Sequence, residues 1–344
     1  MTLEKPLALT LGEPGGIGPE ITLALWHGRK SNPIPPFVWV ADPQFIESRA
    51  ARLGFSPQIA LWSPDLSAEE TAALFETAIP ITPLKAEITD EPGVARAVNG
   101  AGVMGSIEQA VDLVHAGHAS AVVTNPIHKK SLYEAGFTHP GHTEFLGVLA
   151  ERWGGGPFTP VMMLAGPELR TVPATLHIPL KDVPDALDPG ALERLIETTH
   201  HALVQRFGVE DPVIVVAGLN PHAGEEGTMG HEDDAIIAPA VHAARLKNIH
   251  VTGPHPADTL FYQQRRESYD AAIAMYHDQA LLPVKTLAFD ETVNVTLGLP
   301  FIRTSPDHGT ALDIAGRSVA RPDSLRAALS MAAHMVRVET ASAT

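Results

Sequence analysis

The chain has 344 residues, 44% of them hydrophobic and 19% charged, which is typical of a globular protein and long enough for two domains. Its formal net charge of −16 disfavours nucleic acids and anionic membranes as main partners, because both carry negative charge themselves. Cysteine is absent, so thiolate nucleophiles, disulfide scaffolds and cysteine zinc sites are excluded. There is no signal-peptide pattern and no run of about 18 apolar residues, so we expect a cytoplasmic protein.

Apolar runs that are typical of buried strands alternate with runs of helical periodicity. The strand-like runs lie at residues 7–12, 37–42, 120–125, 161–166, 213–218 and 271–276. The helix-like runs lie at residues 19–28, 104–117, 189–208 and 234–248, with a closing helix over 323–344. This alternation predicts an α/β protein with largely parallel sheets.

The first strand leads into a glycine-rich turn, "LTLGEPGGIGPEI", which is followed by a helix. Its glycines permit close approach of the backbone, and a helix N-terminus attracts anions. Asp42 stands about where a Rossmann fold carries the acid that binds ribose, but Ile21 occupies the third glycine position of G-x-G-x-x-G. A tight turn and a glycine loop lining a cleft therefore remain open beside a dinucleotide site.

Three strand-like stretches are each followed by a histidine: His177, His222 and His277. In open α/β sheets the crevice lies beyond the carboxyl ends of the strands, so side chains from different strands meet there. Three neutral imidazoles that leave a fourth position open suit zinc or another divalent ion. The alternative is three unrelated loop histidines, because their spacing in the chain is not diagnostic.

Isolated polar residues in apolar surroundings indicate an anion pocket. Lys285 and Arg303 are such cations, and Asn294 is flanked by β-branched residues. His142 and Thr143 follow Gly141 and add possible donors. Together these residues could bind a phosphate or carboxylate, with Arg as a bidentate fork and Lys as a point charge. Ordinary salt bridges are the alternative for each cation.

Seven motifs occur in order between Leu7 and Arg317: "LGEPGGIGPEI", "TNPIHKK", "GHTEF", "LNPHAGE", "PADTLF", "MYHDQ" and "VNVTLGLPFIRTSPDHGTALDIAG". With them the chain resembles the PdxA family of vitamin B6 biosynthesis. The resemblance implies two α/β/α domains around a cleft, similar to isocitrate and isopropylmalate dehydrogenases, without a Rossmann dinucleotide site. We expect residues 1–135 and 305–344 to form the first domain. Residues 136–304 would form the second, carrying the metal and substrate residues.

The resemblance also implies a site and its cofactors. The divalent metal (zinc, magnesium or cobalt) would be held by His177, His222 and His277. Substrate contacts would come from His142, Thr143, Lys285, Asn294 and Arg303. "DHGTALDIAG" is similar to the adenosine loop of β-decarboxylating dehydrogenases, so NAD or NADP would be lined by His308, Gly309, Thr310 and Asp313. A loop kept only for packing is the alternative there. The resemblance further implies a homodimer whose active sites are shared between subunits.

The implied reaction is the oxidation of 4-phosphooxy-L-threonine to a 2-amino-3-oxo acid that decarboxylates. Lys285, Asp258 and Asp278 are candidates for the groups that handle protons, and either acid could instead orient a metal-binding histidine. Rival substrates within the family are a phosphorylated erythronate and a cyclohexadiene-diol dicarboxylate. A zinc hydrolase would also use three histidines but leaves the "DHGTALDIAG" loop unexplained, and a phosphate-binding acyltransferase has no need of them.

Overall fold

The computed structural model describes residues 3–342, which divide into two compact units. Unit 1 contains the residues up to Pro160 together with Leu299–Arg337, and unit 2 contains Val161–Gly298 and the stretch that begins at Val338. The chain passes from unit 1 into unit 2 and later returns to unit 1. The crossings, however, follow Pro160 and Gly298 rather than residues 135 and 304.

Helix α6 (His142–Ala150) explains why the first crossing lies after Pro160 and not at residue 135. Phe145, Leu146 and Leu149 of this helix are buried in the same hydrophobic cluster as residues of unit 1, including Val103 and Ile107. As a result the expected substrate residues His142 and Thr143 belong to unit 1. Arg303 belongs to it as well, because it follows the second crossing after Gly298. The boundaries expected from the sequence place all three in the second domain.

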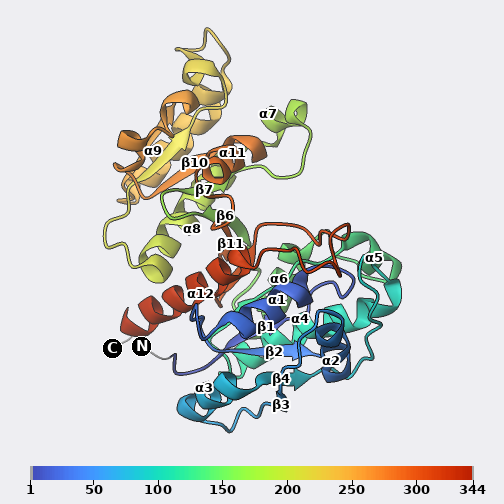
Figure 1. Cartoon of the computed structure of the whole chain (residues 1–344). Helices are drawn as coiled ribbons and strands as arrows, with labels where there is room; N and C mark the ends of the chain where they lie inside the picture. The colour runs from blue at the N-terminus through green and yellow to red at the C-terminus, as the bar shows by residue number, and fades with distance from the viewer. Residues whose placement is uncertain (1–2, 343–344) are drawn as a thin grey trace. The chain divides into compact units, whose positions relative to one another are not determined.

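Unit 1 is built on parallel strands in the order β3-β4-β2-β1-β5-β12. Figure 1 labels the first four of them. Their bounds are β1 (Leu7–Thr10), β2 (Phe37–Ala41), β3 (Ile59–Leu61), β4 (Ile79–Pro83), β5 (Ala121–Val123) and β12 (Arg303–Pro306). β1, β2 and β5 are buried along their whole length. Continuous Leu, Val and Ala runs suit that environment, because a parallel strand packs helices on both faces.

The helices of unit 1 cover this sheet. They are α1 (Gly18–Gly28), α2 (Pro43–Arg52), α3 (Ala68–Thr77), α4 (Gly100–His115), α5 (Lys129–Glu134), α6 and α12 (Asp323–Ser342), which begins in this unit. α4 packs against β1, β2 and β5. Ser106 of α4 fixes this packing, since its hydroxyl donates to the Val40 carbonyl and accepts from the Leu11 amide, both at 2.8 Å.

Unit 2 has a mixed sheet in the order β11-β6-β7-β10-β8-β9. β11 and β7 both pair antiparallel with β6, while β7, β10, β8 and β9 run parallel. The bounds are β6 (Val161–Ala165), β7 (Arg170–Pro173), β8 (Ile214–Ala217), β9 (Val251–His255), β10 (Ala271–Ala274) and β11 (Val293–Leu297).

The helices of unit 2 are α7 (Val183–Ala186), α8 (Pro189–Phe207), α9 (Ala238–Leu246), α10 (Gln263–Arg266) and α11 (His277–Ala288). Asp188 caps the N-terminus of α8, since its side chain accepts from the Ala191 amide, and Gly208 caps the C-terminus in the left-handed conformation. A π-helical turn (Asp233–Ile237) leads directly into α9. α11 packs on β6, β7 and β10, and its inward side chains share a core with residues of β6 and β10.

The mixed α/β fold predicted from the sequence is confirmed. Each of the six strand-like runs contains a strand and each helix-like run a helix, although residues 343–344 of the closing helix lie outside the described part of the chain. Within residues 3–342, no helix is long and apolar enough to cross a membrane.

Candidate active site

The three candidate metal ligands follow three neighbouring parallel strands of unit 2. β10 pairs with β7 on one side and β8 on the other, with Ile273 opposite both Val172 and Val216. The carboxyl ends of these strands therefore lie at one edge of the sheet. His177 follows β7, His277 follows β10 and His222 follows β8.

His177 and His277 lie next to each other at this edge. Their ring centroids are 5.6 Å apart, and both residues line a pocket of about 310 Å³. The other lining residues are Thr175, Ile178, Leu180, Val183, Tyr276 and Asp278. Asp278 Oδ1 lies 2.8 Å from His277 Nδ1. An N–H at Nδ1 that donates to this carboxylate leaves the lone pair on Nε2, the nitrogen that a metal would take.

The backbone is strained at two of the three histidines. His177 has φ 48° and His222 has φ 55°, in the left-handed region that residues other than glycine rarely adopt. Such conformations persist where the surrounding structure imposes them, and they are frequent at functional sites. The strain distinguishes these two histidines from loop histidines whose backbone is free to relax.

Two residues that the sequence analysis missed support the strand ends. Asp233 is fully buried, and its carboxylate accepts from the amides of Leu219 and Asn220 at 2.8 and 3.1 Å, which holds the segment leading to His222. Gln279 bridges β10 and β8, because its Nε2 donates to the Gly218 carbonyl and its Oε1 accepts from the Met275 amide. Gln279 was within reach of sequence reasoning, since it belongs to the "MYHDQ" motif, whereas nothing in the sequence connects Asp233 to position 222.

The donor chemistry of this edge fits a divalent ion, but the ligand set is not complete within the described chain. Residues 3–342 contain no group of three or more His, Asp or Glu side chains arranged to hold a metal. The structure thus brings two of the predicted ligands together at positions 177 and 277. His222 follows the adjacent strand without joining them in a three-ligand group, and its side chain is exposed.

In unit 1, a buried cation lies beside a neutral histidine. Arg303 is 4% exposed, and its Nε and Nη2 donate to Thr124 Oγ1 at 3.2 and 2.7 Å. Burial lowers the pKa of Arg303 to about 10, so the guanidinium stays charged at neutral pH. Burial, and then the charge of Arg303, hold the pKa of His142 well below 6.5.

His142 also opens α6, a nine-residue helix whose N-cap, Gly141, supplies no side-chain hydrogen bond. The residue as a whole is partly exposed, yet its Nε2 atom is buried and has no hydrogen-bond partner among the described residues. Thr143 follows in the first turn. Amides at a helix N-terminus, a buried guanidinium and an unsatisfied imidazole nitrogen together suit an anion such as phosphate.

The remaining expected substrate and proton-handling residues lie in unit 2. Lys285, on α11, is partly buried with its Nζ 5.6 Å from the centroid of the Phe289 ring. Asn294 lies in β11, opposite Leu164 of β6. Asp258 is exposed in a one-turn 3₁₀ segment (Ala257–Thr259).

The candidate cofactor loop, which we define as residues 308–316, follows β12 in unit 1. His308 Nδ1 lies 2.9 Å from the Gly309 carbonyl, while its Nε2 is buried with no hydrogen-bond partner within residues 3–342. The Ile17 amide donates to the Thr310 carbonyl at 3.0 Å, and Asp313 is exposed. A polar loop with an unsatisfied buried nitrogen fits a polar ligand such as a dinucleotide.

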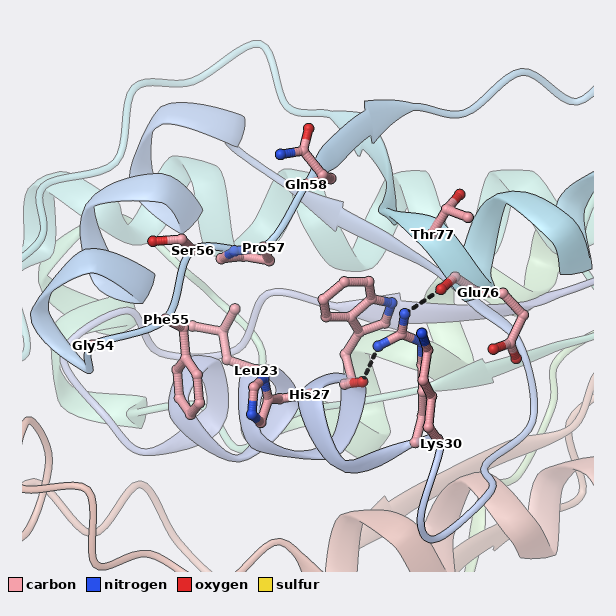
Figure 2. A pocket seen from close by; sticks show the side chains of 12 residues that line it. Leu23, His27, Lys30, Gly54, Phe55, Ser56, Pro57, Gln58, Glu76 and Thr77 are labelled. Atoms are coloured by element: carbon pink, nitrogen blue, oxygen red, sulfur yellow. Dashed lines mark hydrogen bonds between the residues drawn. The ribbon is translucent and has the colours of Figure 1, made fainter.

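A larger pocket, of about 590 Å³, lies elsewhere in unit 1 and contains none of the predicted residues (Figure 2). The ends of α1 and α3 and residues 54–58 line it, and His27 and Phe55 face each other with centroids 4.9 Å apart. The guanidinium of Arg29 donates to the carbonyls of Trp26, Phe75 and Glu76. Arg29 therefore caps the C-terminal ends of both helices, which is a structural role. The larger pocket thus gives no reason to place the active site there.

Comparisons with known proteins show the family to which the chain belongs. The family model described as "Pyridoxal phosphate biosynthetic protein PdxA" matches residues 34–332. A 4-hydroxythreonine-4-phosphate dehydrogenase from Methylorubrum populi is 54% identical, over 97% of this chain and 95% of the relative. A crystal structure of 4-hydroxythreonine-4-phosphate dehydrogenase from Klebsiella pneumoniae superposes with a TM-score of 0.83 at 36% identity, covering 96% of this chain and 99% of the other. The crystal structure of a terephthalate 1,2-cis-dihydrodiol dehydrogenase from Burkholderia xenovorans superposes with a TM-score of 0.64 at 29% identity. The match covers 95% of this chain and 97% of the other.

The fold and the strand-end histidines define an α/β protein whose candidate site lies at the carboxyl edge of parallel strands. The match to the family model covers most of the chain, and the relatives match it over nearly its full length. The chain belongs to the PdxA family.

Proposed function

We propose that this protein is a divalent-metal-dependent, NAD(P)-linked dehydrogenase that oxidises 4-phosphooxy-L-threonine in pyridoxal phosphate biosynthesis. The C3 hydroxyl loses its proton to a base and the C3–H bond gives its hydride to the nicotinamide, which is thereby reduced. The resulting 2-amino-3-oxo acid then loses carbon dioxide. The electron pair of the broken C1–C2 bond forms the C2=C3 double bond of an enol. Protonation of C2 then gives 3-amino-2-oxopropyl phosphate.

The observation that carries the proposal is the pair His177–His277 at the strand edge, in a chain 54% identical to a 4-hydroxythreonine-4-phosphate dehydrogenase. We assign the metal to these two histidines and His222. A divalent ion there would polarise the substrate hydroxyl and stabilise negative charge during decarboxylation. Zinc, magnesium and cobalt are the candidate ions.

Each remaining residue has a role that its surroundings support. Arg303, His142 and Thr143 would bind the phosphate, because a buried cation and helix N–H groups favour a dianion. Lys285 and Asn294 would contact the substrate, with Lys285 as the first candidate for the base. Asp278 would orient His277, which its 2.8 Å contact with Nδ1 favours over proton transfer, while Asp258 remains a second proton-handling candidate.

We further propose that NAD or NADP binds along His308, Gly309, Thr310 and Asp313, and that the enzyme acts in the cytoplasm as a homodimer with shared active sites. Within residues 3–342 the three histidines form no three-ligand group, and a partner's histidine that supplied the third imidazole would complete the site. Dimers with an isologous interface would form two such sites.

Absorbance of the reduced nicotinamide tests the proposal. Purified protein is given 4-phosphooxy-L-threonine, a phosphorylated erythronate or a cyclohexadiene-diol dicarboxylate, each with NAD or NADP and with metal added or chelated. We expect reduction with the threonine derivative, loss of reduction on chelation and recovery with added metal. Preference for another acid identifies a related dehydrogenase, and no reduction with any of them, together with metal-dependent ester hydrolysis, identifies a hydrolase.

A further inference from the structure

The glycine-rich turn that follows β1 has no part in the proposed chemistry, yet it packs against the cofactor loop. Besides the hydrogen bond from the Ile17 amide to Thr310, a Cβ on Gly16 would lie 2.8 Å from the Thr310 carbonyl oxygen. The two backbones are therefore closer than any other residue at position 16 permits. The turn is a contact surface for residue 310.

A second contact holds the far end of the cofactor loop. Glu20, in the first turn of α1, is only 4% exposed, and its Oε1 accepts a hydrogen bond from the Gly316 amide. Gly316 has φ +80°, and a Cβ there would lie 2.8 Å from Pro92. The start of α1 thus fixes the loop at residues 310 and 316, and the exposed Asp313 lies between these two points.

A buried arginine holds both the turn and Glu20. Arg49 of α2 is fully buried, and its Nη2 and Nη1 donate to the carbonyls of Pro14 at 2.6 Å and Gly16 at 3.3 Å. Its Nη1 lies 3.7 Å from Glu20 Oε1, and its Nε donates to Asp90 Oδ1 at 2.8 Å. Arg49 therefore links the glycine-rich turn and Glu20, both of which contact the cofactor loop.

The burial of the Glu20 carboxylate is not explained by a gain in folding stability. Burial raises the pKa of Glu20, and its Oε2 has no hydrogen-bond partner among the described residues. Buried ion pairs contribute little net stability, because desolvation offsets the attraction between the charges. A buried carboxylate that accepts from a loop amide 296 residues away in the chain is better explained by the position that it imposes on the loop.

We propose that Glu20 is a positioning residue, which holds the cofactor loop through the Gly316 amide in the shape that binds NAD(P). This inference rests on the proposed function, which assigns the nucleotide to that loop. Glu20 acts before the cofactor arrives, since its contact with Gly316 lies within the protein itself. Loss of the contact should therefore weaken cofactor binding without changing turnover at saturating cofactor.

The test compares Glu20→Ala, which removes the acceptor, with Glu20→Gln, whose amide oxygen can still accept from Gly316. In protein without cofactor, Glu20→Ala should exchange the amide hydrogens of residues 310–318 roughly tenfold faster than wild type, as expected for a loop that opens locally. Calorimetry should show roughly tenfold weaker NAD(P) binding, with KM for the nucleotide raised alike and kcat unchanged. Glu20→Gln should restore most of the protection and affinity.

Trp26→Phe is the matched control, because it removes one buried hydrogen bond, to the Phe75 carbonyl, from the other end of the same helix. It should lower stability without changing exchange in residues 310–318. Wild-type exchange and affinity in Glu20→Ala would overturn the inference. Asp313→Ala separates this failure from that of the proposed function. If Asp313→Ala weakens NAD(P) binding and Glu20→Ala does not, only the positioning role is lost. If neither changes affinity, the loop does not bind the nucleotide.

Discussion

Asp278 Oδ1 lies 2.8 Å from Nδ1 of His277, and the two residues are consecutive at the start of α11. Because Nδ1 makes this contact, Nε2 of His277 is the nitrogen that remains to bind a metal. His277 lines the same pocket as His177. A carboxylate in this position fixes the orientation and the tautomer of the imidazole. We therefore expect Asp278 to act in metal affinity rather than in proton transfer.

Replacing Asp278 with Ala should reduce metal affinity, because His277 loses the group that fixes its tautomer. Loss of such a partner weakens metal binding by roughly 10- to 100-fold. Metal titration of the stripped protein measures the effect, and excess metal should restore most of kcat. Asp258→Ala is the comparison, and it should keep wild-type metal affinity. Unchanged affinity in Asp278→Ala, with kcat lost even at saturating metal, would instead make Asp278 the proton-handling group.

The strand-end placement of the histidines was predictable because of what the strands are made of. Val213 to Ala217 is a continuous apolar run that only a buried strand explains, so the polar residues after it had to lie at the sheet edge. Strand direction was not predictable in the same way. β6 and β7 form an antiparallel pair, and the alternation of apolar residues does not encode orientation.

Substituting Met for Arg303 should raise KM for the phosphorylated substrate, since methionine keeps the bulk but removes the charged fork. Loss of a hydrogen bond to a charged group is worth about 1.5–3 kcal/mol, which corresponds to roughly a 10- to 100-fold change. Steady-state kinetics with varied substrate measure it, and thermal unfolding checks the fold. Arg303→Lys should lie between Met and wild type, because it retains the charge. If KM stays at the wild-type value, Arg303 has a structural role, to which its contact with Thr124 contributes.

His142 makes folding stability sensitive to acid. Burial holds its folded-state pKa well below 6.5, so the unfolded chain takes up this proton at a higher pH than the folded chain does. Between those two values the unfolded state binds more protons, and stability falls as the pH decreases below 6.5. His142→Gln should flatten that decline in urea unfolding measured from neutral pH downward. Exposed His242→Gln is the control and should leave the slope unchanged, whereas equal slopes for all three proteins would contradict the prediction.

Contacts between segments that are distant in the chain could not be predicted from the sequence. Arg49 and Asp90 lie 41 positions apart, and Glu20 and Gly316 lie 296 apart. No periodicity or motif records such pairs, although both are central to the scaffold under the cofactor loop. The same limit applied to the first domain crossing, because the apolar face of α6 does not say which core will bury it.

Within one chain, His177 and His277 share a pocket, whereas His222 completes no three-histidine group with them in residues 3–342. If the homodimer shares its sites, each site combines the 177–277 pair of one subunit with position 222 of the other. In this arrangement a substitution at position 277 disables the site that holds the 177–277 pair of the same chain, whereas a substitution at position 222 disables the other site of the dimer. Single variants of His222 or His277 to Ala should each lose most bound metal and most activity as homodimers.

Mixing the two inactive variants should restore activity. A heterodimer of His222→Ala and His277→Ala chains has one site with both lesions and one site with neither, because positions 222 and 277 of one site come from different chains. Refolding equal amounts together gives about half heterodimers, and therefore roughly one quarter of wild-type activity and of fully occupied sites, by counting over a symmetric dimer. Mixing His177→Ala with His277→Ala is the control and should recover nothing, since both lesions belong to the same pair. Mass spectrometry measures the heterodimer fraction, and a mixture that contains heterodimer but neither turnover nor bound metal would show that each chain assembles its site alone.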